Sequence, residues 1–226
     1  MSAYYNENNP KMAVWLRALM AARLIGEGDI DERDIRTVSA DDLRGYRRCH
    51  FFAGIAGWDL ALQYAGWPDD REVWTGSSPC QFGSSAARGR TVAADLWRPF
   101  LALVAARRPG VVLGEQVIKD WWADRCVRDL ESMGYAVGAV VLPAWSVGCD
   151  HTRARFYFVG HANGHRESGM RVDAKAFRVP RNRGLTGGLV SPDGLPSRVD
   201  QLSGFGNAIV PQVAAEFIRA YMDIRP

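Results

Sequence analysis

The chain has 226 residues, of which 47% are hydrophobic and 23% are charged, a balance typical of a globular domain with a sizeable core. Its formal charge of +3 permits a polyanionic partner without requiring one. No apolar run reaches the length of a membrane span, and residues 1–11 lack the apolar core of an export signal. We therefore expect a cytoplasmic protein that does not bind membranes.

Strands and helices alternate along the chain after a helical N-terminal segment. Residues 1–9 are interpreted as a loose polar tail, and Asn9 with Pro10 suits the start of a helix that ends at Gly26. A capping-box pattern at 39–42 predicts a short helix to about residue 46. We expect strands at 49–53, 73–75, 111–114, 136–142 and 156–159, and helices starting at 58 and covering 95–108, 121–133 and 211–221. This alternation predicts an α/β fold with a mostly parallel sheet covered on both faces.

A strand, a glycine-containing turn and a helix follow one another between residues 49 and 62. The turn Gly54-Ile55-Ala56-Gly57 lets the backbone approach a ligand, and the helix start offers free N–H groups. Nucleotide-type cofactors are held in this way, although a plain tight turn explains the pattern equally well.

A cysteine preceded by a proline follows the strand at 73–75. Pro79 fixes its own φ and pushes Ser78 into an extended conformation. Cys80 would then lie at the carboxyl edge of the sheet, where open α/β sheets place their ligands. A small buried apolar cysteine is the alternative that this stretch leaves open. The other cysteines, Cys49, Cys126 and Cys149, show no metal-ligand spacing, so we expect free thiols and no metal.

Four further segments line up with Cys80. The segment Phe-Ala-Gly-Ile-Ala-Gly (52–57) precedes it, and Gly-Glu-Gln-Val (114–117), His-Thr-Arg-Ala-Arg (151–155) and Gly-Asn-Ala-Ile-Val-Pro (206–211) follow. In this order they resemble the DNA cytosine-5 methyltransferase family, especially its compact phage and prophage forms, over about 9–160 and 194–221. The resemblance implies a reduced Rossmann-like, S-adenosylmethionine-dependent methyltransferase fold with a helical N-terminal extension and a small basic insert. We divide the chain accordingly into the extension (1–47), the catalytic core (48–160), a target-recognition-like insert (161–193) and a C-terminal segment returning to the core (194–226).

The reaction that the resemblance implies transfers a methyl group to carbon 5 of a cytosine flipped out of DNA. Carbon 5 becomes nucleophilic only after a thiolate adds to carbon 6, and this addition requires a proton donor at N3 and a cation at the carbonyl. By their match to the family motifs, Cys80, Glu115 and Arg155 take these three roles and Arg153 assists. From the residues alone, Glu115 could equally be a carboxylate at a helix start, and the two arginines a solvated strand edge.

The resemblance also implies binding residues for the donor and for DNA. Those expected at the S-adenosyl-L-methionine site are Phe52, Gly54, Ile55, Gly57, Pro79, Asn207 and Val210. Those expected to contact DNA are Gln81, Arg88 and Arg90 after the nucleophile, and Arg178, Arg181 and Arg183 in the insert. A disordered basic loop is the alternative for the insert. We expect a monomer.

The chain departs from the family mainly between the glycine turn and the cysteine. Only 26 positions separate Gly54 from Cys80, where larger family members place two more strands with acidic residues for the ribose and the adenine. We take Asp69, Asp70 and Glu72 as the candidates in this interval; none lies convincingly at a strand end and Ala56 replaces a glycine, so a weak donor pocket is predicted. Two other functions therefore remain open. One is a degenerate methyltransferase-like DNA-binding protein, and the other is a pyrimidine-modifying enzyme that uses another donor or a free nucleotide.

Overall fold

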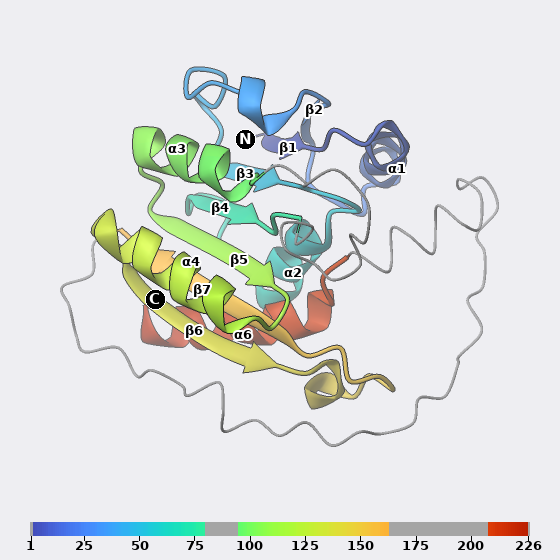
Figure 1. Ribbon diagram of the computed structural model, residues 1–226. Helices are drawn as coiled ribbons and strands as arrows, with labels where there is room; N and C mark the ends of the chain where they lie inside the picture. The colour runs from blue at the N-terminus through green and yellow to red at the C-terminus, as the bar shows by residue number, and fades with distance from the viewer. Residues whose placement is uncertain (1, 80–94, 163–207, 226) are drawn as a thin grey trace, which may run out of the picture.

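A computed structural model describes residues 2–79, 95–162 and 208–225, and its strands form one sheet in the order β2-β1-β3-β4-β5-β7-β6 (Figure 1). The strands are β1 (Ala3–Asn6), β2 (Gly28–Asp31), β3 (Arg48–Phe51), β4 (Val73–Gly76), β5 (Val111–Gln116), β6 (Ala136–Leu142) and β7 (Arg155–His161). The five strands β1 to β5 pair in parallel, whereas β7 runs antiparallel to β5 and β6. This arrangement confirms the predicted α/β fold with a mostly parallel sheet.

Helices cover both faces of the sheet, as Figure 1 shows. They are α1 (Pro10–Ala21), α2 (Gly57–Ala65), α3 (Trp97–Arg107), α4 (Asp120–Ser132) and α6 (Pro211–Ile224), with short 3-10 turns η1 (Ile35–Thr37) and η3 (Ala144–Val147). Side chains that alternate along each strand serve the two faces. In β4, for example, Trp74 packs in the cluster that contains α3 and α4, whereas Val73 packs in the cluster that contains α2 and α6. Among the described residues, no helix combines the length and apolarity needed to cross a membrane.

Residues 1–31 contribute two strands to the sheet as well as a helix. The prediction of a loose tail at 1–9 is wrong, because β1 is buried along its whole length and pairs with β2 on one side and β3 on the other. Tyr4 and Tyr5 fill the cores on opposite faces of the sheet, which a polar tail could not do. The predicted helix start is confirmed, since α1 begins at Pro10 and the Asn9 side chain accepts a hydrogen bond from Lys11 N.

The short helix predicted up to residue 46 does not form. The capping-box hydrogen bonds are present, with Ser39 N donating to Asp42 Oδ2 at 2.8 Å and Asp42 N donating to Ser39 Oγ at 3.3 Å. The chain nevertheless continues in turns to Gly45, whose φ of 88° ends any helical path.

The carboxyl ends of the parallel strands lie along one edge of the sheet. Glu7 follows β1, the glycine turn follows β3, and Ser77 follows β4. Glu115 lies near the end of β5, and β7 starts at the same edge because it runs the opposite way. The segments singled out in the sequence therefore meet at this edge.

Candidate active site

The exit of β4 toward Cys80 is held by two neighbouring elements. Gln116 of β5 donates from Nε2 to the carbonyl oxygen of Ser78 at 2.5 Å and to its hydroxyl at 3.0 Å. On the other side, Trp58 Nε1 of α2 donates to Ser77 Oγ at 3.0 Å. Cys80 and Gln81 themselves lie outside the described residues. Hydrogen bonds thus hold the segment that leads to Cys80 up to Ser78.

Glu115 is a buried carboxyl group paired with an arginine. Its side chain is 9% exposed, and Arg155 Nε lies 2.9 Å from Glu115 Oε1. Burial raises the pKa of Glu115, and the charges of Arg155 and Arg153 and a hydrogen bond from Ser77 only partly oppose this. The group therefore holds a proton at higher pH than an ordinary glutamate, which suits a proton donor.

The two arginines of the His-Thr-Arg-Ala-Arg segment have different partners. Arg155, the first residue of β7, pairs with Glu115, whereas Arg153 Nη2 donates to the carbonyl oxygen of Ala208 at 2.6 Å. Burial and the neighbouring charge of Arg155 lower the pKa of Arg153. Arg153 therefore links the edge of the sheet to the segment that opens α6.

That last segment packs onto the glycine turn. A side chain added at Gly57 would come within 2.8 Å of Ile209 Cγ1, so glycine is needed for this close approach. Val210 follows as the residue that caps α6, while Asn207 lies outside the described residues. The structure thus brings the predicted final segment, from Ala208 onward, to the turn at 54–57.

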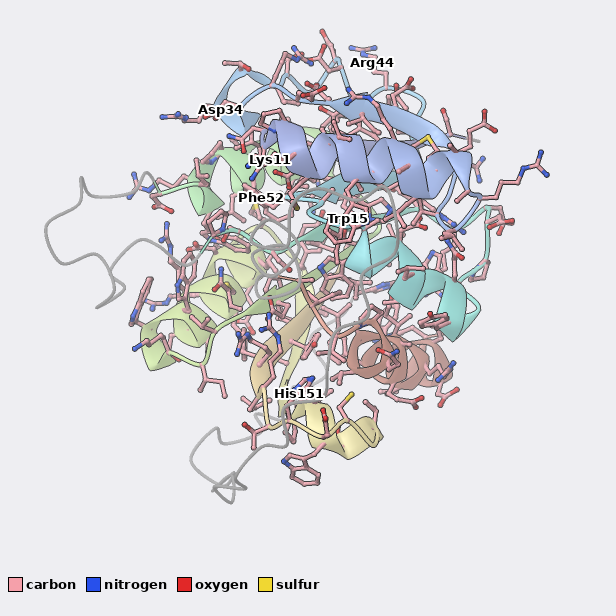
Figure 2. The ribbon with its side chains drawn as sticks, turned by 90° about the vertical axis from the view of Figure 1, so that its right-hand side faces the viewer. Lys11, Trp15, Asp34, Arg44, Phe52 and His151 are labelled. Carbon is pink, nitrogen blue, oxygen red and sulfur yellow. The ribbon has the colours of Figure 1, made fainter. Side chains whose placement is uncertain are left out.

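The glycine turn contains three residues in the left-handed region, which are Phe52 (φ 55°), Gly54 (φ 55°) and Ala56 (φ 61°). Such conformations cost about 1–3 kcal/mol for residues other than glycine and are concentrated at functional sites. Ala56 is buried, with 1% of its surface exposed, so its methyl group packs inside the protein in this conformation. An added Cβ on Gly54 would meet no atom of the described residues closer than Phe52 O at 3.9 Å, so packing among these residues does not require glycine here, whereas the φ of 55° favours it. Figure 2 looks onto this edge and shows Phe52 between α1 and the rest of the sheet, with His151 at the other end.

Glu7 is a site residue that the sequence reasoning missed. Its Oε2 accepts a hydrogen bond from Gly54 N at 2.8 Å, and its Oε1 accepts one from Asn9 N at 2.9 Å. Burial raises the pKa of Glu7, and these two N–H groups oppose the rise. The available signal was the pair Tyr4-Tyr5, which favours a strand, followed by a carboxylate and a helix start.

Asp69 and Glu72, two of the three acidic candidates named between Gly54 and Cys80, lie at the opposite edge of the sheet from this site. Asp69 pairs with Arg48, the first residue of β3, at 2.6 Å. Glu72 precedes β4 and accepts a hydrogen bond from Gly110 N at 2.9 Å. These residues lie at the amino ends of their strands, so the two acidic positions sought in this interval must come from elsewhere.

The expected DNA-contact residues Gln81, Arg88, Arg90, Arg178, Arg181 and Arg183 all lie outside the described residues. Of the described cysteines, Cys49 and Cys126 are fully buried, and burial raises the pKa of both thiols. In residues 2–79, 95–162 and 208–225 there is no group of three or more His, Cys, Asp or Glu side chains that could hold a metal ion.

The family model described as C-5 cytosine-specific DNA methylase matches residues 67–201 of the chain. This span includes Cys80, Glu115, Arg153 and Arg155, whereas the glycine turn and the N-terminal strands precede it. No curated protein sequence matches the chain significantly.

Several solved structures are similar at low sequence identity. Dnmt2 methyltransferase of S. pombe is 16% identical with a TM-score of 0.46, and the match covers 75% of this chain and 54% of that one. A DNMT2 mutant of Spodoptera frugiperda is 12% identical with a TM-score of 0.48, covering 74% and 46%. A putative DNA modification methyltransferase encoded within an E. coli prophage is 13% identical with a TM-score of 0.41, covering 71% and 47%. The chain spans about half the length of these proteins.

Proposed function

Because the chain belongs to the C-5 cytosine-specific DNA methylase family, we propose that it transfers a methyl group from S-adenosylmethionine to carbon 5 of cytosine in DNA. The observation that carries this proposal is the ion pair between the buried Glu115 and the partly buried Arg155, joined at 2.9 Å beside the strand exit that leads to Cys80. This pair supports the proposal because the reaction requires a proton donor and a cation close to the nucleophile.

In this mechanism the thiolate of Cys80 adds to carbon 6 of the flipped base while Glu115 gives its proton to N3. Arg155 stabilises the negative charge that develops on the cytosine carbonyl oxygen, and Arg153 holds the adjoining segment in place. When bound, S-adenosylmethionine would supply an electrophilic methyl group to carbon 5, its sulfur–methyl bond breaking to leave S-adenosylhomocysteine. Solvent water then takes the proton from carbon 5, the electron pair of that bond expels the Cys80 thiolate from carbon 6, and N3 returns its proton to Glu115.

The described residues fit the donor. Glu7 presents a half-buried carboxylate to the Gly54 N–H, and the described residues leave room beside Gly54. Each oxygen of Glu7 accepts one backbone hydrogen bond and keeps a lone pair for a hydroxyl group. We therefore assign the ribose hydroxyls of the donor to Glu7. Phe52, Ile55, Gly57, Pro79, Asn207 and Val210 complete the proposed pocket.

The N-terminal strands weaken the case for a degenerate binding protein. That alternative rested on two strands missing between Gly54 and Cys80, but β1 and β2 lie beside β3, on the side away from β4, so the sheet extends beyond the glycine turn. These strands and Glu7 support donor binding at the turn, and we propose a donor pocket of ordinary rather than reduced affinity.

Incubation with labelled S-adenosylmethionine and cytosine-containing DNA, followed by nucleoside analysis, tests the proposal. Labelled 5-methylcytosine is expected with the wild type and not with Cys80→Ser. The matched control is Cys149→Ser, which removes a partly exposed cysteine and should leave the product unchanged. Label found only on a free nucleotide, or on another atom of the base, would favour the pyrimidine-modifying alternative. DNA binding without any detectable binding of S-adenosylmethionine would favour the degenerate DNA-binding protein.

A further inference from the structure

A buried histidine and a buried aspartate lie beneath the glycine turn. His50 in β3 is 1% exposed, and Asp59 in the first turn of α2 is fully buried. The Nε2 atom of His50 lies 3.5 Å from Asp59 Oδ1, and its Nδ1 lies 2.9 Å from Thr75 Oγ1 in β4. One imidazole ring therefore contacts the helix that follows the proposed donor turn and the strand that leads to Cys80.

The surroundings of the pair indicate where its proton resides. Asp59 Oδ2 accepts hydrogen bonds from Gly26 N at 3.0 Å and from Gln63 Nε2 at 2.6 Å. In contrast, Asp59 Oδ1 and His50 Nε2 have no hydrogen-bond partner among the described residues, and they face each other across 3.5 Å. A proton on Nε2 satisfies both atoms, whereas without it two buried acceptors would face each other.

Two further groups face the ring and the aspartate. Tyr5 of β1 stacks on His50 with ring centroids 5.0 Å apart, and its hydroxyl donates to the carbonyl oxygen of Gly26 and also interacts with Asp59. Arg48, two residues earlier in β3, pairs with Asp69. Burial raises the pKa of Asp59, yet His50 and the hydrogen bonds from Gly26 N and Gln63 together outweigh it and lower that pKa to about 2. Asp59 is therefore an anion with His50 as its partner.

We propose that His50 is a positioning residue that couples the donor turn to the strand of the nucleophile. Its Nε2–H holds Asp59 at the start of α2, and its Nδ1 holds the hydroxyl of Thr75, so that α2 and β4 move together. This inference rests on the proposed function, because it assigns the turn at 52–57 to the donor.

Two features make the coupling stiff. The hydrogen bonds of His50 are fully buried, so water cannot replace them when α2 shifts relative to β4. The Trp58–Ser77 hydrogen bond joins the same two elements closer to the edge of the sheet. Contact of the donor with the turn would thus be transmitted through α2 to the residues just before Cys80.

Two single variants each remove one of the two contacts of His50, that with Asp59 or that with Thr75. Asp59→Asn keeps the shape of the side chain and removes its charge, and Thr75→Val keeps the strand residue and removes its hydroxyl. We would measure the Kd of S-adenosylhomocysteine by calorimetry. We would also measure the alkylation rate of Cys80, resolved by peptide mass spectrometry, with and without this ligand. Imidazole ¹⁵N spectra of wild type would report which ring nitrogen carries the proton.

We expect the ligand to change the alkylation rate of Cys80 in wild type, and each single variant to abolish most of that change. Each should also weaken ligand binding about ten-fold, the size expected for a buried hydrogen bond to a charged group. The double variant should be little worse than the poorer single variant, because both act through one ring. His161→Gln is the matched control: its ring also contacts a hydroxyl, that of Tyr221 at 2.8 Å, and its loss should change neither quantity.

Three results would overturn the inference. They are additive effects of the two variants, a lower melting temperature with unchanged binding and alkylation, and an ¹⁵N spectrum showing Nε2 without a proton. If wild type itself binds neither S-adenosylhomocysteine nor S-adenosylmethionine, the proposed function is wrong, and the coupling that rests on it is wrong as well. Normal binding in wild type and in both variants rejects the coupling alone.

Discussion

Replacing Glu7 with glutamine should weaken donor binding severely. In the wild type both carboxylate oxygens accept backbone hydrogen bonds, from Asn9 N at 2.9 Å and Gly54 N at 2.8 Å. The glutamine amide can present only one oxygen, so its NH₂ group must face one of these N–H groups. The variant therefore loses a charge-assisted hydrogen bond in the free protein and the negative acceptor offered to the ribose.

The loss of one hydrogen bond to a charged group corresponds to about 1.5–3 kcal/mol, or roughly 10- to 150-fold in the Kd of S-adenosylmethionine. Calorimetric titration measures this directly. Asp69→Asn is the matched control, because Asp69 is a carboxylate in the interval after the glycine turn but lies with Arg48 at the other edge. We expect its Kd to equal that of wild type. Wild-type affinity in Glu7→Gln together with a loss in Asp69→Asn would refute the assignment of the ribose to the N-terminal strand.

Four other predictions follow from the same geometry. Cys80→Ser should abolish turnover without unfolding the protein, and DNA containing 5-fluorocytosine should trap wild type covalently but not this variant; an adduct through another residue would contradict the assignment. Gln116→Met should slow formation of that adduct at least ten-fold, because Ser78 loses both of its hydrogen bonds to the Gln116 side chain; unchanged rates would show that the strand exit is held by Trp58 alone. Neutralising Arg178, Arg181 and Arg183 together should flatten the salt dependence of DNA binding, as measured by fluorescence anisotropy, and an unchanged slope would mean that DNA runs elsewhere. Asp59→Asn should destabilise the protein at neutral pH and much less in acid, as seen by urea unfolding.

The strands and helices of the central part could be predicted from local patterns, whereas the N-terminal strands could not. The strands β4 and β6 are short apolar runs bounded by turn residues, and the pattern identified them almost to the residue. β1 has only four residues and is followed by the polar run Glu7-Asn8-Asn9, so its composition is that of a tail. Tertiary contacts make this segment a strand, because it pairs with β2 on one side and with β3 on the other.

The residues of the candidate site that belong to a recognisable sequence motif could be predicted. Glu115 and Arg155 are far apart in the sequence, and their match to the family motifs was enough to expect them together. Glu7, His50 and Asp59 belong to no motif that was identified, and their roles depend on contacts across the sheet. The search for acidic residues stayed between Gly54 and Cys80 because it assumed that neighbours in the sheet are neighbours in the chain. Parallel strands joined by crossovers do not require this, since any strand can be placed beside β3 by a connection of sufficient length.

The pH dependence predicted for Asp59→Asn follows from the direction in which folding shifts the pKa of Asp59. The pKa of Asp59 in the folded protein is about 2, below the value near 4 of an unfolded aspartate. A lowered pKa stabilises the folded state at every pH above the unfolded value and ceases to do so as the pH falls through the folded value. The difference corresponds to about 2–3 kcal/mol at neutral pH, which Asp59→Asn should lose. Between about pH 4 and pH 2 the wild type loses the same contribution, so the free energies of unfolding of the two proteins should converge.

The exposed carboxylate of Asp69 provides the control, since Asp69→Asn should change stability by less than about 1 kcal/mol at either pH. A gap between wild type and Asp59→Asn that stays constant from neutral pH to about pH 3 would mean that His50 does not hold Asp59 as an anion.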